Sequence, residues 1–502
     1  MGGGRLARRA PLLAVCLAGG ALRFATLGQQ SFWLDEAATG RLMRMGLGGM
    51  LRALPDGEST PPVYYVLAWV WTRAFGTSEV GIRSLSALVG TLTVPVVYLA
   101  AARLLDRRAG LAAAALAAFS PLLVWYSQEA RSYAVLVALS AASLWALSAA
   151  LESGAAQRWL AAWAAAAALA LATHNFAVFV ILPEAVWLAR SLGRRAAPAV
   201  GAVGLVGAVL APLALHQRAQ GGAAFIAASP LGTRLAQAAK QLVVGYDAPG
   251  ELALTLVGAG LVLGLLGLLA RGAAGPARGR ALGLVGVAGA GVGLPVGLAV
   301  VGLDYVITRN LIAAWVPAAI ALSAGVSLRA GARAGPPLVA GLCAVGLAVT
   351  TGVALDGRYE RDDWRAAAGT LAGPGASALV VTPSSGRVPL AYYLPASRPL
   401  PATGAPVTWV EVIGLGARGV GAPVRSPPIP AAPPALAGFD APVAVRRATF
   451  TVLRYRASGA PVVVTPGALA PLALGAGAGG PAMILTASPT KRVVSSRHQS
   501  NH

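Results

Sequence analysis

Two adjacent carboxylates, Asp35 and Glu36, follow the first long apolar run, in the segment 31–37 with the sequence Ser-Phe-Trp-Leu-Asp-Glu-Ala. Aromatic residues of this kind lie at the depth of lipid headgroups in membrane proteins. A carboxylate at that depth can accept a proton from an attacking hydroxyl group when its oxygen comes within about 3 Å of that hydroxyl. In the alternative interpretation, both are solvated loop acids that help to start a helix.

A second polar segment, residues 127–133 with the sequence Ser-Gln-Glu-Ala-Arg-Ser-Tyr, forms a very tight turn between two apolar runs. The planar guanidinium group of Arg131 has the geometry to bind a phosphate. Glu129 has the chemistry to orient an acceptor or a sugar hydroxyl. The alternative is an interfacial ion pair with Tyr133 as a membrane anchor.

Two further residues lie at turns between apolar runs. Arg309 belongs to the segment 304–310, Asp-Tyr-Val-Ile-Thr-Arg-Asn, and either binds an anionic partner or extends its side chain to lipid headgroups. His174, within Thr-His-Asn-Phe at 173–176, can hydrogen-bond a substrate, although a single histidine at a helix turn is more often structural.

The elements that must position these residues are membrane-spanning helices. Of 502 residues, 56% are hydrophobic and only 12% are charged, a composition that excludes a soluble enzyme. Eleven apolar runs predict an α-helical polytopic membrane protein with about eleven transmembrane helices. These runs cover about 10–27, 83–102, 109–126, 133–151, 158–173, 176–190, 197–215, 251–270, 281–302, 310–328 and 336–354.

The net charge of +22 indicates orientation rather than nucleic-acid binding, because the basic residues are almost all arginines and many lie in short loops between apolar runs. The apolar stretch 61–75 is too short to span, since its fifteen residues reach only about 22 Å. Excluding it makes every cytoplasmic loop basic, with the N-terminus inside. These loops contain Arg103, Arg107, Arg108, Arg158, Arg190, Arg194, Arg195, Arg271, Arg278, Arg280, Arg329 and Arg333.

The same topology divides the chain into three parts. Residues 1–355 form the transmembrane domain, whose first span we expect to be uncleaved and whose first external loop covers 28–82. The mixed composition of 356–458 predicts a small external α/β domain. Residues 459–502 are rich in Ala, Pro and Gly and predict a disordered tail.

The order and placement of the motifs resemble the GT-C glycosyltransferases, in particular the bacterial family-39 group related to protein O-mannosyltransferases and to the aminoarabinose transferases that modify lipid A. The resemblance covers about residues 5–395. It rests on Trp-Leu-Asp-Glu at 33–36, Thr-Pro-Pro-Val-Tyr-Tyr at 60–65, the segments 127–133 and 173–179, the Arg309 loop, and Asp-Trp-Arg-Ala-Ala-Ala at 363–368.

The resemblance implies an inverting transferase of the cytoplasmic membrane. It would move a sugar, mannose-like or a pentose, from a polyprenyl-phosphate donor to a hydroxyl of a glycan, lipid or protein on the external face. Asp35 would be the general base and Glu36 would help to position it or the acceptor. Arg131 and Arg309 would neutralise the lipid phosphate, and Glu129 would line the sugar pocket. Further substrate contacts would come from Tyr64, Tyr133 and His174.

Two questions stay open at this stage. Some relatives need a divalent cation and others do not, so metal dependence is open and no metal ligands are assigned. Some carry a lysine where this chain has Thr60, so here the arginines would have to supply the phosphate contacts.

The rival function is a transporter or flippase of lipid-linked sugars, but only Glu184 lies deep in a span, and the other acids gather in external loops.

Overall fold

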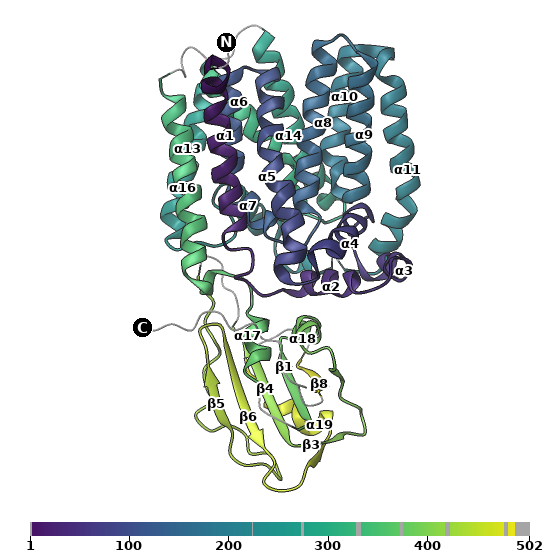
Figure 1. The fold of residues 1–502 in the computed structure, drawn as a ribbon, viewed down its shortest axis with the longest axis vertical. Coiled ribbons are helices and arrows are strands. Elements are labelled where there is room, and N and C mark those ends of the chain that lie inside the picture. The colour runs from purple at the N-terminus through teal and green to yellow at the C-terminus, as the bar shows by residue number, and fades with distance from the viewer. Residues whose placement is uncertain are drawn as a thin grey trace. The chain divides into compact units, whose positions relative to one another are not determined.

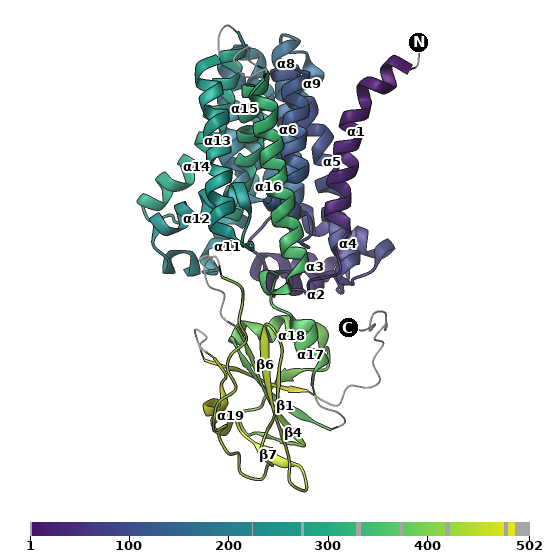
Figure 2. The same cartoon turned by 90° about the vertical axis from the view of Figure 1, so that its left-hand side faces the viewer.

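The computed structural model describes residues 3–222, 224–272, 276–327, 333–371, 375–416, 422–475 and 480–486. Arg329 and residues 487–502 lie outside the described residues. The chain separates into two compact units, one formed by Met1–Gln29 and Thr39–Asp356, the other by Gln30–Ala38 and Gly357–His502. The first unit is helical, and the second is built around a β-sheet (Figures 1 and 2).

The long helices of the first unit run side by side, whereas α3 and α4 are short and lie at one end of it (Figure 1). Helix α2 (Leu34–Met43) begins in the second unit and ends in the first. The other α-helices of the first unit are α1 (Gly3–Phe24), α3 (Leu47–Gly57), α4 (Val63–Phe75), α5 (Glu79–Leu104), α6 (Arg107–Phe119), α7 (Pro121–Ser127), α8 (Tyr133–Glu152), α9 (Gln157–Thr173), α10 (Val178–Leu192), α11 (Ala197–Ala219), α12 (Leu231–Val244), α13 (Glu251–Gly272), α14 (Pro276–Val300), α15 (Trp315–Ser327) and α16 (Gly335–Leu355).

Within the described residues, seven helical segments are long and apolar enough to cross a membrane, or eight if α6 and α7 form one bent span. The 45-residue segment Asn175–Ala219 is one of the seven and contains both α10 and α11. Two further helices bear on the number of spans: the 22-residue α1, whose segment Ala10–Phe24 is apolar, and α9, with 17 residues. The predicted helical membrane fold is therefore confirmed, while the number of eleven spans stays a prediction.

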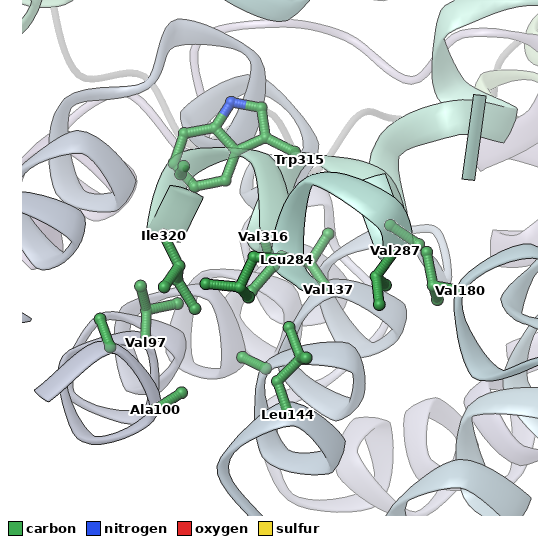
Figure 3. Close-up of a cluster of buried hydrophobic side chains, with 14 of the residues drawn as sticks. Val97, Ala100, Val137, Leu144, Val180, Leu284, Val287, Trp315, Val316 and Ile320 are labelled. Atoms are coloured by element: carbon green, nitrogen blue, oxygen red, sulfur yellow. The ribbon is translucent and has the colours of Figure 1, made fainter. Parts of the chain in front are cut away.

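The core of the helical unit is built from small and branched apolar side chains on several helices. Val97 of α5, Val137 of α8, Val180 of α10, Leu284 of α14 and Val316 of α15 all belong to one buried cluster (Figure 3). Dense packing of this kind resists changes in volume. This packing therefore fixes the relative positions of the helices that the candidate-site loops connect.

Helices α6 and α7 form a bent pair, with an angle of 57° between them. Ser120 lies at the bend and caps α7, because its hydroxyl accepts a hydrogen bond from the Leu123 N–H at 3.3 Å. The bend leaves carbonyl groups at the end of α6 without their helical partners. Gly346 of α16 lies directly against the Phe119 carbonyl, where an added Cβ would come within 2.0 Å of the oxygen.

Arg23 of α1 supplies donors to the end of α6. Its guanidinium group is 1% exposed and donates to the carbonyls of Ala117 at 2.9 Å and Ala118 at 3.0 Å. Its Nε donates to the Ser127 hydroxyl at 3.2 Å. Helix α1 therefore satisfies the carbonyl groups that the bend exposes in an apolar environment.

Gln128, directly after α7, makes the reciprocal contact with the end of α1. Its side-chain amide donates to the Leu22 carbonyl at 3.0 Å, the Arg23 carbonyl at 3.2 Å and the Thr26 hydroxyl at 2.8 Å. The loop that follows α7 is thus fixed at its first residue.

The second unit contains a six-stranded sheet with the strand order β2-β8-β1-β4-β6-β5. β1 (Ser377–Thr382) runs parallel to β4 (Trp409–Leu415), and the other pairs are antiparallel. The remaining strands of this sheet are β2 (Arg398–Pro399), β5 (Val443–Arg446), β6 (Phe450–Arg456) and β8 (Ala482–Thr486), and β3 (Ala405–Val407) pairs with β7 (Val462–Val464) in a second sheet.

Both faces of the larger sheet are covered by apolar side chains. Trp364 of α17 (Trp364–Gly369) and Leu390 of α18 (Arg387–Tyr393) pack on one face with Leu379 and Ile413. Leu469 of α19 (Pro466–Leu469) belongs to the cluster on the other face. Because both faces are buried, all six residues of β1 are buried and its central residues, 378–381, are all apolar rather than alternating.

The structure differs from the sequence-based boundaries in two segments. Residues 462–486, expected within a disordered tail, contain β7, α19 and β8, and β8 pairs with both β1 and β2. Its five residues, Ala-Met-Ile-Leu-Thr, are too few to alter the Ala/Pro/Gly-rich average of that region. Residues 30–38, expected within an external loop of the transmembrane domain, belong to the second unit.

Replacing Arg23 by Met should destabilise the helical unit. The substitution leaves the carbonyl groups at the end of α6 without donors, and each buried unpaired group costs about 1–3 kcal/mol. We expect a clearly lower unfolding temperature in detergent micelles. The exposed Arg108, replaced in the same way, is the matched control and should change stability by less than about 0.5 kcal/mol. Equal unfolding temperatures for the two variants would contradict this role of Arg23.

Candidate functional site

The loop between α3 and α4 carries Glu58 and Thr60 and is held by side chains from distant helices. Asn175, in the 3₁₀ turn η1 (Asn175–Ala177), donates its side-chain amide to the Ser59 carbonyl at 3.2 Å. Gln217 of α11 donates to the Thr60 carbonyl at 3.2 Å. These two amides fix the backbone that follows Glu58, so the position of this loop depends on η1 and α11 as well as on its own chain neighbours.

Glu58 forms a buried ion pair with Arg131, which lies in the loop between α7 and α8. One guanidinium nitrogen of Arg131, Nη1, lies 2.9 Å and 3.1 Å from the two carboxylate oxygens. The same nitrogen donates to the Thr39 hydroxyl at 3.1 Å. Both charged side chains are only 5% exposed. Removing either partner of such a pair is far more costly than breaking a surface ion pair, because it leaves an unpaired buried charge.

Two tyrosines of α4 lie beside this ion pair. Tyr65 is fully buried, and its hydroxyl lies 3.1 Å from the Thr60 hydroxyl. Burial raises the pKa of Tyr65 well above its usual value, Glu58 adds to the rise, and Arg131 opposes it. Tyr65 is therefore a neutral hydroxyl at physiological pH. Tyr64, the residue predicted from sequence, is also buried and packs edge-on against Tyr65 with ring centroids 5.5 Å apart.

His174 lies between α9 and α10 and is 2% exposed. Its Nδ1 accepts a hydrogen bond from the Phe176 N–H at 3.2 Å. Burial, together with the positive charges of Arg131 and Arg309, lowers the pKa of His174 to about 3. The imidazole is therefore neutral, with its proton on Nε2. Its ring packs against that of Tyr133, with a centroid distance of 5.5 Å.

Glu129 shares the loop of Arg131 and is 3% exposed. Its Oε1 accepts a hydrogen bond from the indole nitrogen of Trp125 at 2.8 Å, one helical turn earlier in α7. The end of α7 therefore fixes the direction of the Glu129 side chain. Its predicted place in the sugar pocket stays a prediction.

Arg309 lies in the 3₁₀ helix η4 (Thr308–Ala314) and is half-buried. Its guanidinium carbon lies 5.6 Å from the ring centroid of Phe225. The loop before it is fixed by Arg234 of α12, which donates at 2.8 Å both to the Asp304 carboxylate and to the Val306 carbonyl. The segment that leads to Arg309 is therefore braced by α12.

The structure thus brings several of the predicted residues together within the helical unit. Arg131, Tyr133 and His174 are neighbours, and Arg309 is close enough for its charge to act on His174. Asp35 and Glu36 lie in the first turn of α2, in the segment 30–38 that belongs to the second unit. Their approach to the arginines stays a prediction.

Sequence reasoning missed the partners of Arg131. The sequence places Glu58 only among the acids of the external loops and gives Thr39 no distinguishing feature. The available signal was that Glu58 lies two residues before the Thr-Pro-Pro motif. Nothing in the sequence indicates that this loop meets the loop of Arg131, seventy residues later.

The described part of the chain contains no group of three or more His, Cys, Asp or Glu residues that could hold a metal ion. The positively charged side chains among the predicted site residues are those of Arg131 and Arg309. A cavity of about 300 Å³ that is not lined by these residues lies in the helical unit. It is lined by mostly apolar side chains from α6, α7 and α12–α16, including Pro121, Leu242, Val292, Trp315 and Leu342.

Glu184 of α10, the residue that favoured the transporter alternative, has two hydrogen-bond donors. The Ser143 hydroxyl of α8 lies 3.0 Å from one carboxylate oxygen, and the indole nitrogen of Trp163 in α9 lies 2.9 Å from the other. This buried carboxyl group links three helices, which is a structural role.

Residues 59–216 match the model of a protein family described as dolichyl-phosphate-mannose-protein mannosyltransferase. The match covers less than half of the chain. It includes Tyr64, Glu129, Arg131, Tyr133 and His174 but ends before Arg309 and begins after the carboxylates of α2. The predicted resemblance to membrane glycosyltransferases is confirmed over these residues.

Solved structures show a distant likeness. ArnT from Cupriavidus metallidurans bound to undecaprenyl phosphate aligns with 16% identity and a TM-score of 0.49, over 78% of this chain and 85% of that chain. The apo oligosaccharyltransferase of Archaeoglobus fulgidus aligns with 13% identity and a TM-score of 0.44, over 72% of this chain. The alignment covers 57% of that archaeal chain, less than two thirds of its length. No curated protein sequence matches the chain.

The low pKa of His174 makes stability depend on pH. Below about 6.5 the unfolded chain binds a proton at this histidine that the folded chain does not bind until about pH 3. Folding is therefore weakened as the pH falls through this window, by about 2 kcal/mol between pH 7 and pH 5. His174→Asn retains an acceptor for the Phe176 N–H but does not titrate, so thermal unfolding of this variant should lose less stability over that interval. If both proteins lose the same stability between pH 7 and pH 5, His174 is not the group that makes folding depend on pH.

Proposed function

We propose that this chain is an inverting glycosyltransferase of the cytoplasmic membrane, which moves a mannose-like or pentose sugar from a polyprenyl-phosphate donor to a hydroxyl acceptor on the external face. One observation carries the proposal. Arg131, His174 and Arg309 converge in a helical unit whose residues 59–216 match a mannosyltransferase family model. A cation pair in this position suits a lipid phosphate, because arginine binds phosphate oxygens with well-defined geometry.

Arg131 and Arg309 would act differently on the phosphate. Arg131 is buried and oriented by Glu58, so it supplies a fixed positive charge. Arg309 is half-buried and on a braced loop, so it is the arginine that approaches the phosphate more directly. Fixed charges that face a developing anion stabilise it without reorganisation. The neutral His174 adds no competing charge and retains an Nε2 proton to donate.

The chemical step is a displacement at the anomeric carbon. The acceptor oxygen forms the new bond as the bond to the phosphate oxygen breaks, which inverts the configuration. The hydroxyl proton passes to the Asp35 carboxylate, and the bonding electrons leave with the polyprenyl phosphate. Glu36 positions Asp35 or the acceptor, and Glu129, Tyr64 and Tyr133 contact the sugar or acceptor. Orientation of the two reactants is the protein's main contribution besides charge stabilisation.

The apolar cavity of about 300 Å³ supports a donor with a long hydrocarbon chain. Its lining by α12–α16 gives isoprene units an environment away from water, while the phosphate stays at the arginines. The partners are therefore the lipid-linked donor, a hydroxyl-bearing acceptor and membrane lipids.

Asp35→Asn tests the proposed base. The amide keeps the shape of the side chain but cannot accept the proton, and loss of a general base lowers rates by about 10²- to 10⁴-fold. Sugar transfer by purified protein should fall by this factor, with membrane insertion and unfolding temperature unchanged. Full transfer activity in this variant would refute the assignment.

Arg309→Gln tests the phosphate contact. Removal of one transition-state contact to a developing anion lowers kcat by about 10²- to 10³-fold. The matched control is Arg218→Gln, at the exposed end of α11, which should retain normal transfer. Steady-state assays with a polyprenyl-phosphate sugar measure both variants, and equal activity would exclude Arg309 from the site.

A further inference from the structure

The segment that carries Asp35 is bound to the C-terminal part of the chain by its own side chains and backbone. The Ser31 hydroxyl donates to the Asp362 carbonyl at 2.7 Å and accepts from the Trp364 N–H at 3.0 Å. One hydroxyl therefore joins this segment to the two residues that flank Asp363, the N-cap of α17.

The next residue, Phe32, is held by α18. Its backbone N–H donates to the Tyr393 hydroxyl at 2.7 Å. Its fully buried ring packs edge-on against Tyr392, with ring centroids 5.0 Å apart. Burial of the ring and satisfaction of the N–H both depend on these two tyrosines.

Arg361 makes the third set of contacts. Its guanidinium carbon lies 3.9 Å from the ring centroid of Trp33, a cation–π distance. Its backbone N–H donates to the Gln30 side chain at 3.3 Å. Four successive residues, 30–33, are thus each held by the C-terminal unit.

Asp35 follows only two residues after Trp33. It lies in the first turn of α2, where the Ala37 N–H donates to the Trp33 carbonyl at 2.9 Å. The backbone of Asp35 therefore has little freedom relative to the residues that hold Gln30–Trp33. Trp364 of α17 and Leu390 of α18 pack on the sheet with Leu379 and Ile413. The two helices that hold residues 30–33 are therefore part of the hydrophobic core of the unit.

We propose that the C-terminal α/β unit positions the general base, and that Ser31 and Tyr393 are positioning residues that act through Asp35. This inference rests on the proposed function of Asp35. A base must lie within hydrogen-bond reach of the acceptor hydroxyl, and a displacement of about 1 Å can cost on the order of 100-fold in rate. The unit would thus contribute to catalysis without touching the substrate.

Tyr393→Phe is the primary test. It removes the hydroxyl that accepts from the Phe32 N–H and leaves both rings in place. The matched control is Tyr455→Phe, in β6 of the same unit, whose buried hydroxyl donates to the Pro434 carbonyl at 3.0 Å. We expect kcat for transfer to fall by about 10- to 100-fold in Tyr393→Phe. The KM for a polyprenyl-phosphate sugar should not change, and Tyr455→Phe should retain the normal kcat.

A second pair covers the case in which Tyr393→Phe fails to fold. Ser31→Ala removes the hydroxyl that donates to the Asp362 carbonyl and accepts from the Trp364 N–H, and Ser31→Thr restores a hydroxyl at this position. The alanine variant should lose kcat in the same way, and the threonine variant should recover most of it. A purely structural hydroxyl would lower the unfolding temperature without separating kcat from KM.

The outcomes separate this inference from the proposed function. If Tyr393→Phe and Ser31→Ala keep the kcat of Tyr455→Phe while Asp35→Asn is inactive, positioning by the C-terminal unit is overturned and the base assignment stands. If Asp35→Asn is fully active, the proposed function itself fails.

Discussion

The buried ion pair between Arg131 and Glu58 is the interaction on which the candidate site depends. Two buried charges are stable only when they are paired and make further hydrogen bonds, here the one that Arg131 donates to the Thr39 hydroxyl. The pair joins the loop before α4 to the loop before α8. The amides of Asn175 and Gln217 hold the first of these loops, and Gln128 holds the second. The guanidinium group of Arg131, which we propose binds the lipid phosphate, is therefore positioned by several parts of the helical unit at once.

This arrangement also sets the protonation of its surroundings. Burial, together with the charges of Arg131 and Arg309, keeps His174 neutral, and burial keeps the Tyr65 hydroxyl protonated. The site thus offers fixed cations and neutral donors. Such an environment suits a reaction whose main demand is to accommodate a departing phosphate.

The sequence predicted the helices well because apolar runs of membrane length leave few alternatives to a helix. It also identified Arg131, Tyr133 and His174, which the structure brings together. It could not pair Arg131 with Glu58, because that contact depends on how loops seventy residues apart meet. For the same reason it did not assign β8 to the sheet or residues 30–38 to the C-terminal unit, since both depend on partners distant in sequence.

The most direct test of this account is a vesicle assay with the purified full chain, a polyprenyl-phosphate donor labelled in its sugar, and a hydroxyl-bearing acceptor. The assay follows the label in the acceptor, the released polyprenyl phosphate and the side of the membrane on which the intact donor lies. We predict glycosylated acceptor with inverted anomeric configuration, formed in equal amount to the released lipid phosphate. Movement of intact donor across the vesicle without any product would contradict a transferase and indicate a transporter.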